Sequence, residues 1–465
     1  MGRFRVAVAV AVAALLCAGG ASAVRAATRA ATQELTITAS DGTKLACGLV
    51  LPAGSPPTGG WPGVMLFHGL GQTHAAMETI ANVALAPTGF ASLMCDARGT
   101  GGSGGTFGLD GPKEVQDARD LFAWFAARAD VSNTQIGAFG LSLGGGAVWN
   151  AAVAGVPFKA IVPAITWTSL GTALNPAGVP KTGEVQTLAQ VVSASSWEPA
   201  LAVARIDLAT GVVTPAVKSA EAARSSRPKL RSLHVPTLLL QGRHDFLFDL
   251  DQAVAAYGLL AGPKRLYLGD LGHPPAANPA AELPTYLGEA VAWFAHYLAG
   301  RGAVHGGVEL AHDPWDGSTT SYTALPRTRH VSVNLPGSKR IAAGSSVSRS
   351  VRLTGGPLET FGDGSVSVRY ARNSVLTEIR AMVSVKGGAA PVTVGAAKIG
   401  GGSGVVKIPL LDEAVLLPRG RRLTVVVGGT TADGVYEPLG SGGAPAITIG
   451  RITLNLSLLR KPVSR

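Results

Sequence analysis

Charged residues are scarce in this sequence of 465 residues, since Asp, Glu, Lys and Arg together make up 15% of it. Aromatic residues are also few, at 6%, yet hydrophobic residues reach 46%. This balance excludes an intrinsically disordered chain, because disorder requires low hydrophobicity and high net charge. The length exceeds what one ordinary hydrophobic core supports, so we expect two or three domains.

Several patterns that bind metals or phosphates are absent. The three cysteines form no C-x-x-C pair and no H-E-x-x-H sequence occurs, so no metal site is indicated. A glycine-rich stretch, residues 99–104, lacks the Gly-Lys-Ser/Thr ending of a phosphate-binding loop, and no helix follows it at once. We interpret it as a structural loop at the edge of a sheet and expect no cofactor.

Acidic residues are fewer than basic ones, and the formal net charge is +11. The arginines are scattered, and no Lys/Arg run is interleaved with aromatic residues as nucleic-acid binding would require. We therefore expect no nucleic-acid partner. A soluble protein that tolerates or uses an anionic cell envelope is the interpretation that we prefer.

The apolar stretch near the N-terminus, residues 6–18, is shorter than the roughly 20 residues that span a bilayer. It follows two arginines and precedes a small-residue Ala-Ser-Ala sequence, an order typical of a signal peptide. We expect residues 1–31 to be a signal peptide, and the protein to be secreted without an integral membrane span. Cys17 leaves a lipoprotein as the alternative, which Leu16 disfavours because a lipobox normally has a smaller residue there.

Buried strands alternate with helices over roughly the first 300 residues. An antiparallel hairpin opens this region, and runs too uniformly apolar to face water follow it. The expected hairpin strands are 33–38 and 44–51, the buried strands include 63–67, 91–95, 160–165 and 236–242, and helices are expected at 75–86 and 115–128. This alternation predicts a mostly parallel α/β sheet.

Residues 167–231 interrupt the alternation with mixed helical and proline-rich sequence. The stretch is too long for a plain connection, so we expect a cap inserted over the functional site. After about residue 300, short alternating runs separated by Gly- or Pro-containing turns indicate a β-sandwich or jelly roll. The expected organisation is an α/β domain over residues 32–300, a linker over 301–325 and a β-sandwich over 326–465.

A G-x-S-x-G pattern, Gly140-Leu141-Ser142-Leu143-Gly144, lies between a predicted strand and a Gly/Ala-rich helical run. This is the setting of a nucleophile elbow, where a tight turn forces the serine into a strained backbone conformation. The glycines lack side chains, so the strand and the helix can pack closely. Ser142 is therefore the candidate nucleophile, although the bare pattern also occurs by chance in a chain with 61 glycines.

A serine hydroxyl is a weak nucleophile that needs a base, and the base needs a carboxylate to orient it. In the α/β-hydrolase fold the acid follows the serine in sequence and the histidine comes last. Asp245 and His273 match this order, and each lies just beyond a predicted strand. Asp249 and Asp251 remain rival acids, while His244 is expected to be exposed rather than catalytic.

The oxyanion of a tetrahedral intermediate needs two preorganised hydrogen-bond donors. We expect one donor to be the backbone N–H of Leu143, the residue after the candidate nucleophile. We place the other at the backbone N–H of Leu70, in the loop that follows the first buried strand of the predicted parallel sheet.

Together these motifs resemble the X-Pro dipeptidyl-peptidase-like hydrolases, a family that includes cocaine esterase and the cephalosporin/glutaryl acylases. The motifs that carry the resemblance are His68-Gly69-x-Gly71, Asp96-x-Arg98-Gly99-x-Gly101-x-Ser103, Gly140-x-Ser142-x-Gly144 and the C-terminal β-sandwich. Residues 162–167 and 175–181 resemble a secreted, actinobacterial-type branch. The resemblance covers nearly all of the mature chain, and implies a nucleophile at Ser142, an acid at Asp245, a base at His273 and a jelly-roll final domain.

The resemblance also implies that the second strand lies antiparallel beside the strand ending at Asp96, which would bring Cys47 near Cys95. We then expect their Cα atoms to be roughly 4.4–6.8 Å apart, the range of a disulfide. One departure concerns the oxyanion hole, where cocaine-esterase-like members use a tyrosine side chain that Leu70 cannot replace. In addition, no pair of acids is clearly placed to bind the free amino terminus of a peptide.

These features predict a secreted serine hydrolase that cleaves an ester or amide bond, including the X-Pro dipeptidyl type, through an acyl-enzyme. The expected substrate is a small ester, amide or peptide. A carboxylesterase or lipase of the same fold is one alternative, favoured by the apolar cap. The other is a catalytically silent hydrolase fold whose sandwich binds a surface partner, and the intact Ser-Asp-His set argues against it.

Overall fold

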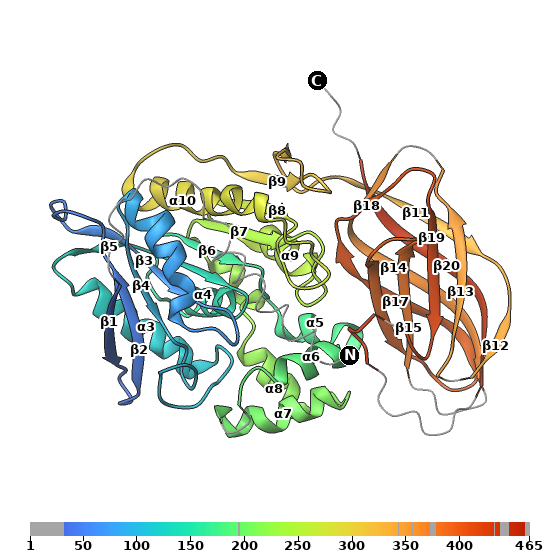
Figure 1. Cartoon of the computed structure of the whole chain (residues 1–465). Coiled ribbons are helices and arrows are strands. Elements are labelled where there is room, and N and C mark those ends of the chain that lie inside the picture. The colour runs from blue at the N-terminus through green and yellow to red at the C-terminus, as the bar shows by residue number, and fades with distance from the viewer. Residues whose placement is uncertain are drawn as a thin grey trace.

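The computed structural model describes residues 32–193, 196–342, 344–354, 357–372, 378–431, 433–437 and 446–460. The expected signal peptide, residues 1–31, lies outside the described residues. In the described part of the chain, every helix is too short or too polar to cross a membrane. Figure 1 shows a sheet covered by helices beside a second body that consists of strands.

A ten-stranded sheet forms the first body. Its strands are β1 (Gln33–Thr38), β2 (Lys44–Val50), β3 (Trp61–Phe67), β4 (Ala91–Cys95), β5 (Val131–Leu141), β6 (Ile161–Ala164), β7 (Thr237–Gly242), β8 (Lys264–Gly269), β9 (Gly307–Ala311) and β10 (Thr319–Tyr322). They lie in the order β1-β2-β4-β3-β5-β6-β7-β8-β9-β10. β1, β2 and β10 pair antiparallel with their neighbours, whereas β4 to β9 are joined by parallel pairing. The opening hairpin and the mostly parallel sheet are therefore confirmed.

Helices cover both faces of this sheet, which explains why every residue of β6 and β7 is buried. Neighbouring side chains of a strand point to opposite faces, so Met65 and Leu66 belong to different cores. The helices of the core around Met65 are α3 (Pro112–Ala126), α4 (Leu143–Val153) and α9 (Leu250–Leu259), and those of the core around Leu66 are η2 (Ile80–Leu85) and α10 (Leu283–Ala299).

The segment expected to form a helix over residues 75–86 is less regular than predicted. It consists of a 3-10 turn η1 (His74–Met77), the π-helical η2 and a second 3-10 turn η3 (Ala86–Thr88). Pro87 lies in η3 and has no N–H to donate, so an α-helix could not continue through it without losing a hydrogen bond.

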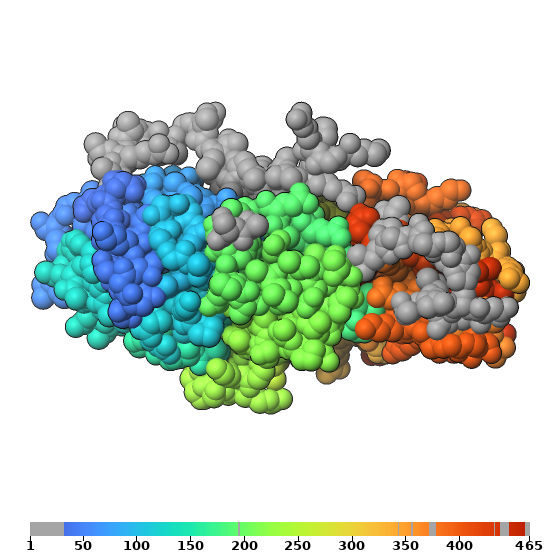
Figure 2. All heavy atoms as spheres, turned by 90° about the horizontal axis from the view of Figure 1, so that it is seen from below, coloured from blue at the N-terminus to red at the C-terminus, as the bar shows by residue number. Residues whose placement is uncertain are grey.

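The cap expected over residues 167–231 is occupied by helices that follow β6 and precede β7. They are α5 (Leu170–Leu174), η4 (Pro176–Gly178), α6 (Thr182–Ala189), α7 (Pro199–Ala209), α8 (Pro215–Ala223) and η6 (Arg227–Ser232). Cap residues such as Trp167 and Leu201 share a core with Leu143 of α4 and Phe248. The cap therefore packs on the start of α4. Figure 2 shows its green surface between the first body and the C-terminal strands.

Residues 301–325 are not the plain linker that the sequence analysis expected. They contain β9 and β10, which extend the first sheet beyond β8. At five and four residues, these strands are too short to give a reliable periodic signal. Only the tertiary pairing with β8 reveals them as part of the sheet.

The second body consists of two antiparallel sheets. Their strands are β11 (Thr328–Leu335), β12 (Lys339–Ile341), β13 (Ser346–Arg352), β14 (Leu358–Arg372), β15 (Glu378–Val385), β16 (Pro391–Lys398), β17 (Ser403–Glu413), β18 (Leu416–Leu417), β19 (Arg422–Gly428) and β20 (Ile447–Leu459). One sheet runs β11-β20-β14-β17, with β12 and β18 attached, and the other β13-β19-β15-β16. Val366 and Ile452 of one sheet share a core with Val383 and Val425 of the other. The sheets thus pack as two layers, and the jelly-roll connectivity stays a prediction.

Arg243, just beyond β7, joins the two bodies. Its side chain is 1% exposed, and its Nε donates to the carbonyl oxygen of Ala414 at 2.7 Å. The N–H of Ala414 donates back to the carbonyl oxygen of Arg243 at 2.8 Å. The guanidinium also pairs with Glu359 of β14. A buried, fully engaged arginine at this position fixes the start of the loop after β7 against the C-terminal body.

A disulfide joins Cys47 to Cys95, as the sequence resemblance implied, and links β2 to β4. The two residues are direct partners in the antiparallel register. Their Cα atoms are 4.0 Å apart, closer than the expected 4.4–6.8 Å. The next pair carries the backbone hydrogen bond from Asp96 to Ala46, so the cysteines occupy the narrow, non-hydrogen-bonded position, where opposing Cα atoms approach most closely.

Candidate active site

Ser142 lies at the sharp turn between β5 and α4, as the G-x-S-x-G pattern predicts. Its φ is 53° and its ψ is −113°, in a region that residues with a side chain avoid. The surrounding chain holds it there. Its N–H donates to the carbonyl oxygen of Ala164 at 2.9 Å, and its carbonyl oxygen accepts from the hydroxyl of Thr166 at 2.7 Å.

The glycines of the elbow make this turn sterically feasible. A Cβ on Gly140 would collide with the carbonyl group of Gly144. A Cβ on Gly144 would collide with the carbonyl oxygen of Phe67 at the end of β3. Both collisions are with backbone, which cannot move aside as a flexible side chain could, so β3, β5 and α4 approach this closely only because the two residues are glycine.

The three residues expected to form a catalytic set meet in one chain of hydrogen bonds. Ser142 Oγ lies 2.9 Å from His273 Nε2, and His273 Nδ1 lies 2.8 Å from Asp245 Oδ2. The other oxygen of the fully buried Asp245 accepts from the N–H groups of Leu247 and Phe248, both at 2.9 Å. The loops that follow β7 and β8 bring Asp245 and His273 to the carboxyl edge of the sheet, where Ser142 stands.

Asp245 and His273 each favour the ionised form of the other. Burial opposes ionisation of His273, but the charge and hydrogen bond of Asp245 outweigh it and raise the pKa of the imidazole above its ordinary value. Burial likewise opposes ionisation of Asp245, and the same partner together with several N–H donors lowers the pKa of that carboxyl. The ring of Phe248 packs edge-on against His273, with centroids 5.0 Å apart, and restricts the orientation of the base.

The rival acids of the sequence analysis have other partners. Asp249 Oδ2 accepts from the N–H of Asp412 at 3.3 Å, and Asp251 pairs with Arg227 at 2.7 Å. Neither carboxylate forms a hydrogen bond with His273. Asp245 is therefore the acid that orients the imidazole.

His244 is not exposed as expected. It is half-buried, and its Nε2 lies 2.9 Å from the carbonyl oxygen of Pro391 in β16. Burial lowers the pKa of its imidazole to about 4. The C-terminal body covers this histidine. Because the two residues in contact are 147 positions apart, no local sequence pattern could predict the contact.

The two expected oxyanion donors stand at either side of the elbow. Leu143 is the first residue of α4, where helix N–H groups have no partner within the helix. Leu70 follows the end of β3. Within the described residues, neither N–H donates to another protein group. Their role stays a prediction.

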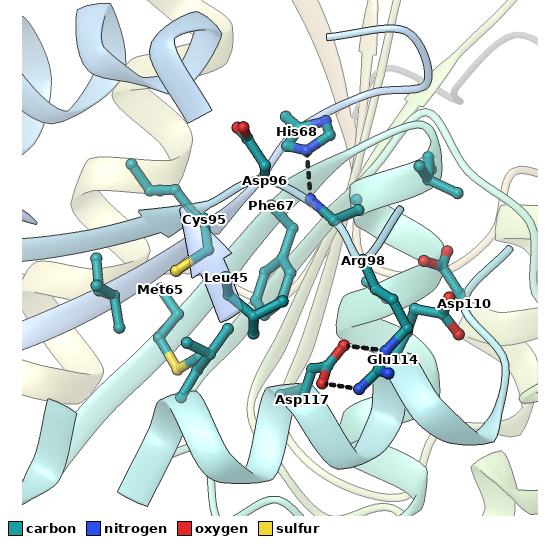
Figure 3. A pocket seen from close by; sticks show the side chains of 18 residues that line it. Leu45, Met65, Phe67, His68, Cys95, Asp96, Arg98, Asp110, Glu114 and Asp117 are labelled. Carbon is teal, nitrogen blue, oxygen red and sulfur yellow. Dashed lines mark hydrogen bonds and ion pairs between the residues drawn. The ribbon is translucent and has the colours of Figure 1, made fainter. Parts of the chain in front are cut away.

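His68 fixes the loop that carries Leu70. The N–H of Ala97 donates to His68 Nε2 at 2.9 Å, so the proton of the neutral ring lies on Nδ1 and is donated to the carbonyl oxygen of Gly69 at 2.8 Å. A dashed line at the labelled His68 ring marks the first of these bonds in Figure 3. Burial lowers the pKa of this imidazole, which favours the neutral form that both bonds require.

Two charged cap residues near the catalytic set were missed in the sequence analysis. Lys181 precedes α6 and is fully buried, and its Nζ donates to the carbonyl oxygens of Phe246 and Leu247 at 2.7 and 3.1 Å. Glu184 of α6 is half-buried and accepts no hydrogen bond from the described residues. Burial raises the pKa of its carboxyl to about 7, and its charge acts on His273. The only signal was the motif at residues 175–181, which ends at Lys181.

Among the described residues, one group has the composition of a metal site, Glu34, His74 and Glu78. The His74 ring already contacts Asp96 through Nδ1 at 2.8 Å and Glu34 through Nε2 at 3.1 Å. Both ring nitrogens are thus engaged by protein carboxylates. None of these residues belongs to the hydrogen-bonded chain of Ser142.

Solved structures share the fold over almost the whole chain. A CocE/NonD family hydrolase from Staphylococcus aureus has a TM-score of 0.71 at 15% identity, covering 91% of this chain and 93% of its own. An aminopeptidase from a marine sediment thaumarchaeote has a TM-score of 0.71 at 12% identity, with coverages of 95% and 98%. An α-amino acid ester hydrolase has a TM-score of 0.70 at 13% identity, with coverages of 94% and 98%. These similarities show an α/β-hydrolase-like fold followed by antiparallel sheets.

No curated protein sequence matches the chain. The family model described as X-Pro dipeptidyl-peptidase (S15 family) matches residues 41–274, half of the chain. The matched range begins in the opening hairpin and ends just after His273, so it contains the elbow, the acid loop and the base. The protein is thus a serine-type hydrolase, and it belongs to the X-Pro dipeptidyl-peptidase (S15) family.

Proposed function

We propose that this hydrolase cleaves an ester or amide bond through an acyl-enzyme formed on Ser142. The observation that carries the proposal is the unbroken chain from Ser142 Oγ through His273 to Asp245, with steps of 2.9 and 2.8 Å. Distances of this size allow a proton to pass between nucleophile and base without rearrangement. The strained elbow presents the hydroxyl, and the buried acid holds the imidazole in one orientation.

In the proposed reaction, His273 Nε2 takes the proton from Ser142 as Oγ attacks the substrate carbonyl. Asp245 keeps the other ring proton on Nδ1 and stabilises the imidazolium that forms. The backbone N–H groups of Leu143 and Leu70 donate hydrogen bonds to the oxyanion. His273 then protonates the leaving alcohol or amine, and water repeats the sequence to release the acid.

Glu184 favours substrates that carry a free amino group. Its half-buried carboxyl accepts no hydrogen bond from the described residues, and it is close enough to Lys181 and His273 to interact electrostatically with both. An ammonium group placed there would pair with it and would favour its ionised form. This fits the substrates implied by the names of the family and of two structural neighbours, an aminopeptidase and an α-amino acid ester hydrolase.

A carboxylesterase or lipase of the same fold is the second candidate. The apolar cluster formed by Leu143, Trp167 and Phe248, with Leu70 packed against it, favours an apolar acyl group beside the elbow. The two candidates differ in one respect that can be measured, which is whether turnover depends on a free amine.

The test compares kcat/KM for three substrates: an X-Pro anilide with a free amino terminus, the same anilide acetylated at that amine, and a short-chain p-nitrophenyl ester. A preference for the free amine that Glu184→Gln abolishes supports the peptidase or amino-ester specificity. A preference for the ester, unchanged in Glu184→Gln, supports the esterase. Absence of measurable turnover of all three substrates by the wild-type protein would favour the alternative of a binding protein without catalytic activity.

We also propose that the protein is secreted, on the basis of the N-terminal signal-peptide pattern. Expression of the full chain in a secreting bacterial host, followed by N-terminal sequencing of the protein in the medium, tests this. We expect recovery of a chain that has been cleaved within residues 1–31, at or after the Ala-Ser-Ala sequence. Retention of the uncleaved chain inside the cell would contradict it.

A further inference from the structure

The motif at residues 175–181 ends in a lysine, Lys181, whose side chain lies in the protein interior. Ala177 and Gly178 both adopt positive φ values, 55° and 73°, which turn the chain sharply after α5. The N–H of Lys181 then donates to the carbonyl oxygen of Leu174 at 2.7 Å, closing the turn. Lys181 is completely buried, an uncommon position for a lysine, and one that requires compensating partners.

The partners of the Lys181 ammonium belong to the loop of the candidate catalytic acid. Nζ donates to the carbonyl oxygens of Phe246 and Leu247, the two residues that follow Asp245. The N–H of Leu247 donates to Asp245 Oδ1 on the other side of the same turn. Lys181 therefore holds the backbone that in turn holds the acid.

The charged groups that act most strongly on Lys181 are four carboxyl groups. Burial lowers the pKa of the Lys181 ammonium, and Asp249, Glu184, Asp245 and Glu413 oppose this effect by favouring its charged form. Its positive charge in turn opposes protonation of His273, whereas Asp245 and Glu184 favour it. Lys181 thus lies among acids that come from the cap, the acid loop and the C-terminal body, and burial together with Asp249 and Asp245 raises the pKa of one of them, Glu413, well above its ordinary value.

The C-terminal body also contacts the acid loop and the part of the cap that carries Lys181. Glu413 of β17 accepts from the N–H of Asp245 at 3.2 Å. The N–H of Gly183 donates to the carbonyl oxygen of Val435, and Thr182 Oγ1 donates to that of Glu437, both at 2.9 Å. The C-terminal body therefore holds the acid loop through Asp245 and the start of the cap helix α6 through Thr182 and Gly183.

We propose that Lys181 is a positioning residue, which holds the turn at residues 245–248 so that Asp245 faces His273 and which couples the cap to the catalytic set. The inference rests on the proposed function, because it requires Asp245 to orient a catalytic base. Lys181 itself does not touch the reacting atoms. Its removal leaves the carbonyl oxygens of Phe246 and Leu247 without their donor and frees the turn to shift.

The experiment uses the mature enzyme and the variant Lys181→Met, with Lys218→Met as the matched control. Lys218 is an exposed lysine of the cap helix α8, so the same substitution there leaves the acid loop untouched. For Lys181→Met we expect kcat to fall by about 10- to 100-fold with little change in KM, since small displacements of catalytic groups cost that much. Loss of the ammonium should also move the acidic limb of the kcat/KM profile upward by about half a pH unit or more.

Lys181→Gln keeps an amide donor for one carbonyl oxygen but no charge, and we expect it to recover part of kcat while keeping the shifted pH profile. Normal kcat and an unshifted profile in Lys181→Met would overturn the proposal. Unfolding of both variants at a temperature where Lys218→Met stays folded would also overturn it, by assigning Lys181 to stability alone. These outcomes can be distinguished from failure of the proposed function itself. That failure would appear as a wild-type protein without hydrolytic activity, or as a Ser142→Ala variant that retains it.

Discussion

His273 contacts one oxygen of Asp245 twice, through its backbone N–H at 2.9 Å and through its ring Nδ1 at 2.8 Å. The acid therefore fixes both the main chain and the imidazole of the base. Its other oxygen is held by two N–H groups of its own turn, so the carboxylate has no freedom to rotate away. The orientation of the base is set by the loop after β7 rather than by the loop that carries the histidine.

The first prediction concerns pH. His273 must be neutral to accept the proton of Ser142, and its pKa is raised above the ordinary value of about 6.5. Activity should therefore be present above this raised pKa and lost as the pH falls through it. The measurement is kcat/KM against pH on an uncharged ester, which avoids the titration of a substrate amine. Asp245→Asn should lower the midpoint and reduce kcat by about 10³- to 10⁴-fold, and a wild-type midpoint well below 6.5 would contradict the assignment.

The second prediction concerns the elbow. Gly144→Ala places a Cβ against the carbonyl oxygen of Phe67, so the start of α4 must move and displace Ser142. We expect kcat/KM to fall by about 10²-fold or more. Gly288→Ala is the control, because a Cβ added there meets nothing within 4 Å. Gly288 lies in α10, where alanine stabilises a helix by about 0.5–1 kcal/mol relative to glycine. Equal activity in both variants would show that the close approach of β3 and α4 is unimportant.

The third prediction concerns the disulfide. Cys47 and Cys95 close a loop with a sequence separation of 48, and we expect their double replacement by alanine to lower the free energy of unfolding by about 2–4 kcal/mol. Urea denaturation with and without a reductant measures the effect. The reductant should destabilise the wild type and leave the double variant unchanged. Indifference of the wild type to complete reduction would contradict this prediction.

The fourth prediction concerns the pair of Arg98 and Asp117 (Figure 3), which lines a pocket together with Leu143 and Gly144. Both side chains are buried, and two hydrogen bonds of 2.9 and 2.5 Å join them. Asp117→Asn removes the buried countercharge of Arg98 and leaves the guanidinium only its pair with the more exposed Asp41 at 2.7 Å, so it should cost about 1.5–3 kcal/mol of stability. The matched control, Asp130→Asn, breaks the more exposed pair with Arg128 and should cost at most about 1 kcal/mol. Equal effects in urea denaturation would refute the distinction.

Sequence reasoning located the residues whose chemistry is tied to a local pattern. Ser142 has its glycines beside it, and Asp245 and His273 each follow an apolar strand, so strand order alone places them at one edge of the sheet. Lys181 and Glu184 carry no such pattern. Lys181 contacts the acid loop only because the cap folds back over about 60 residues of sequence. His244 and the strands β9 and β10 were misjudged for the same reason, since their partners come from distant segments.

The most direct test of the central claim is covalent trapping of the nucleophile. The mature enzyme is incubated with a fluorophosphonate, and peptide mass spectrometry locates the adduct. We predict one adduct on Ser142, absent from Ser142→Ala and formed far more slowly in His273→Ala, with parallel loss of ester hydrolysis. An adduct on another serine, or full hydrolytic activity in Ser142→Ala, would contradict the account.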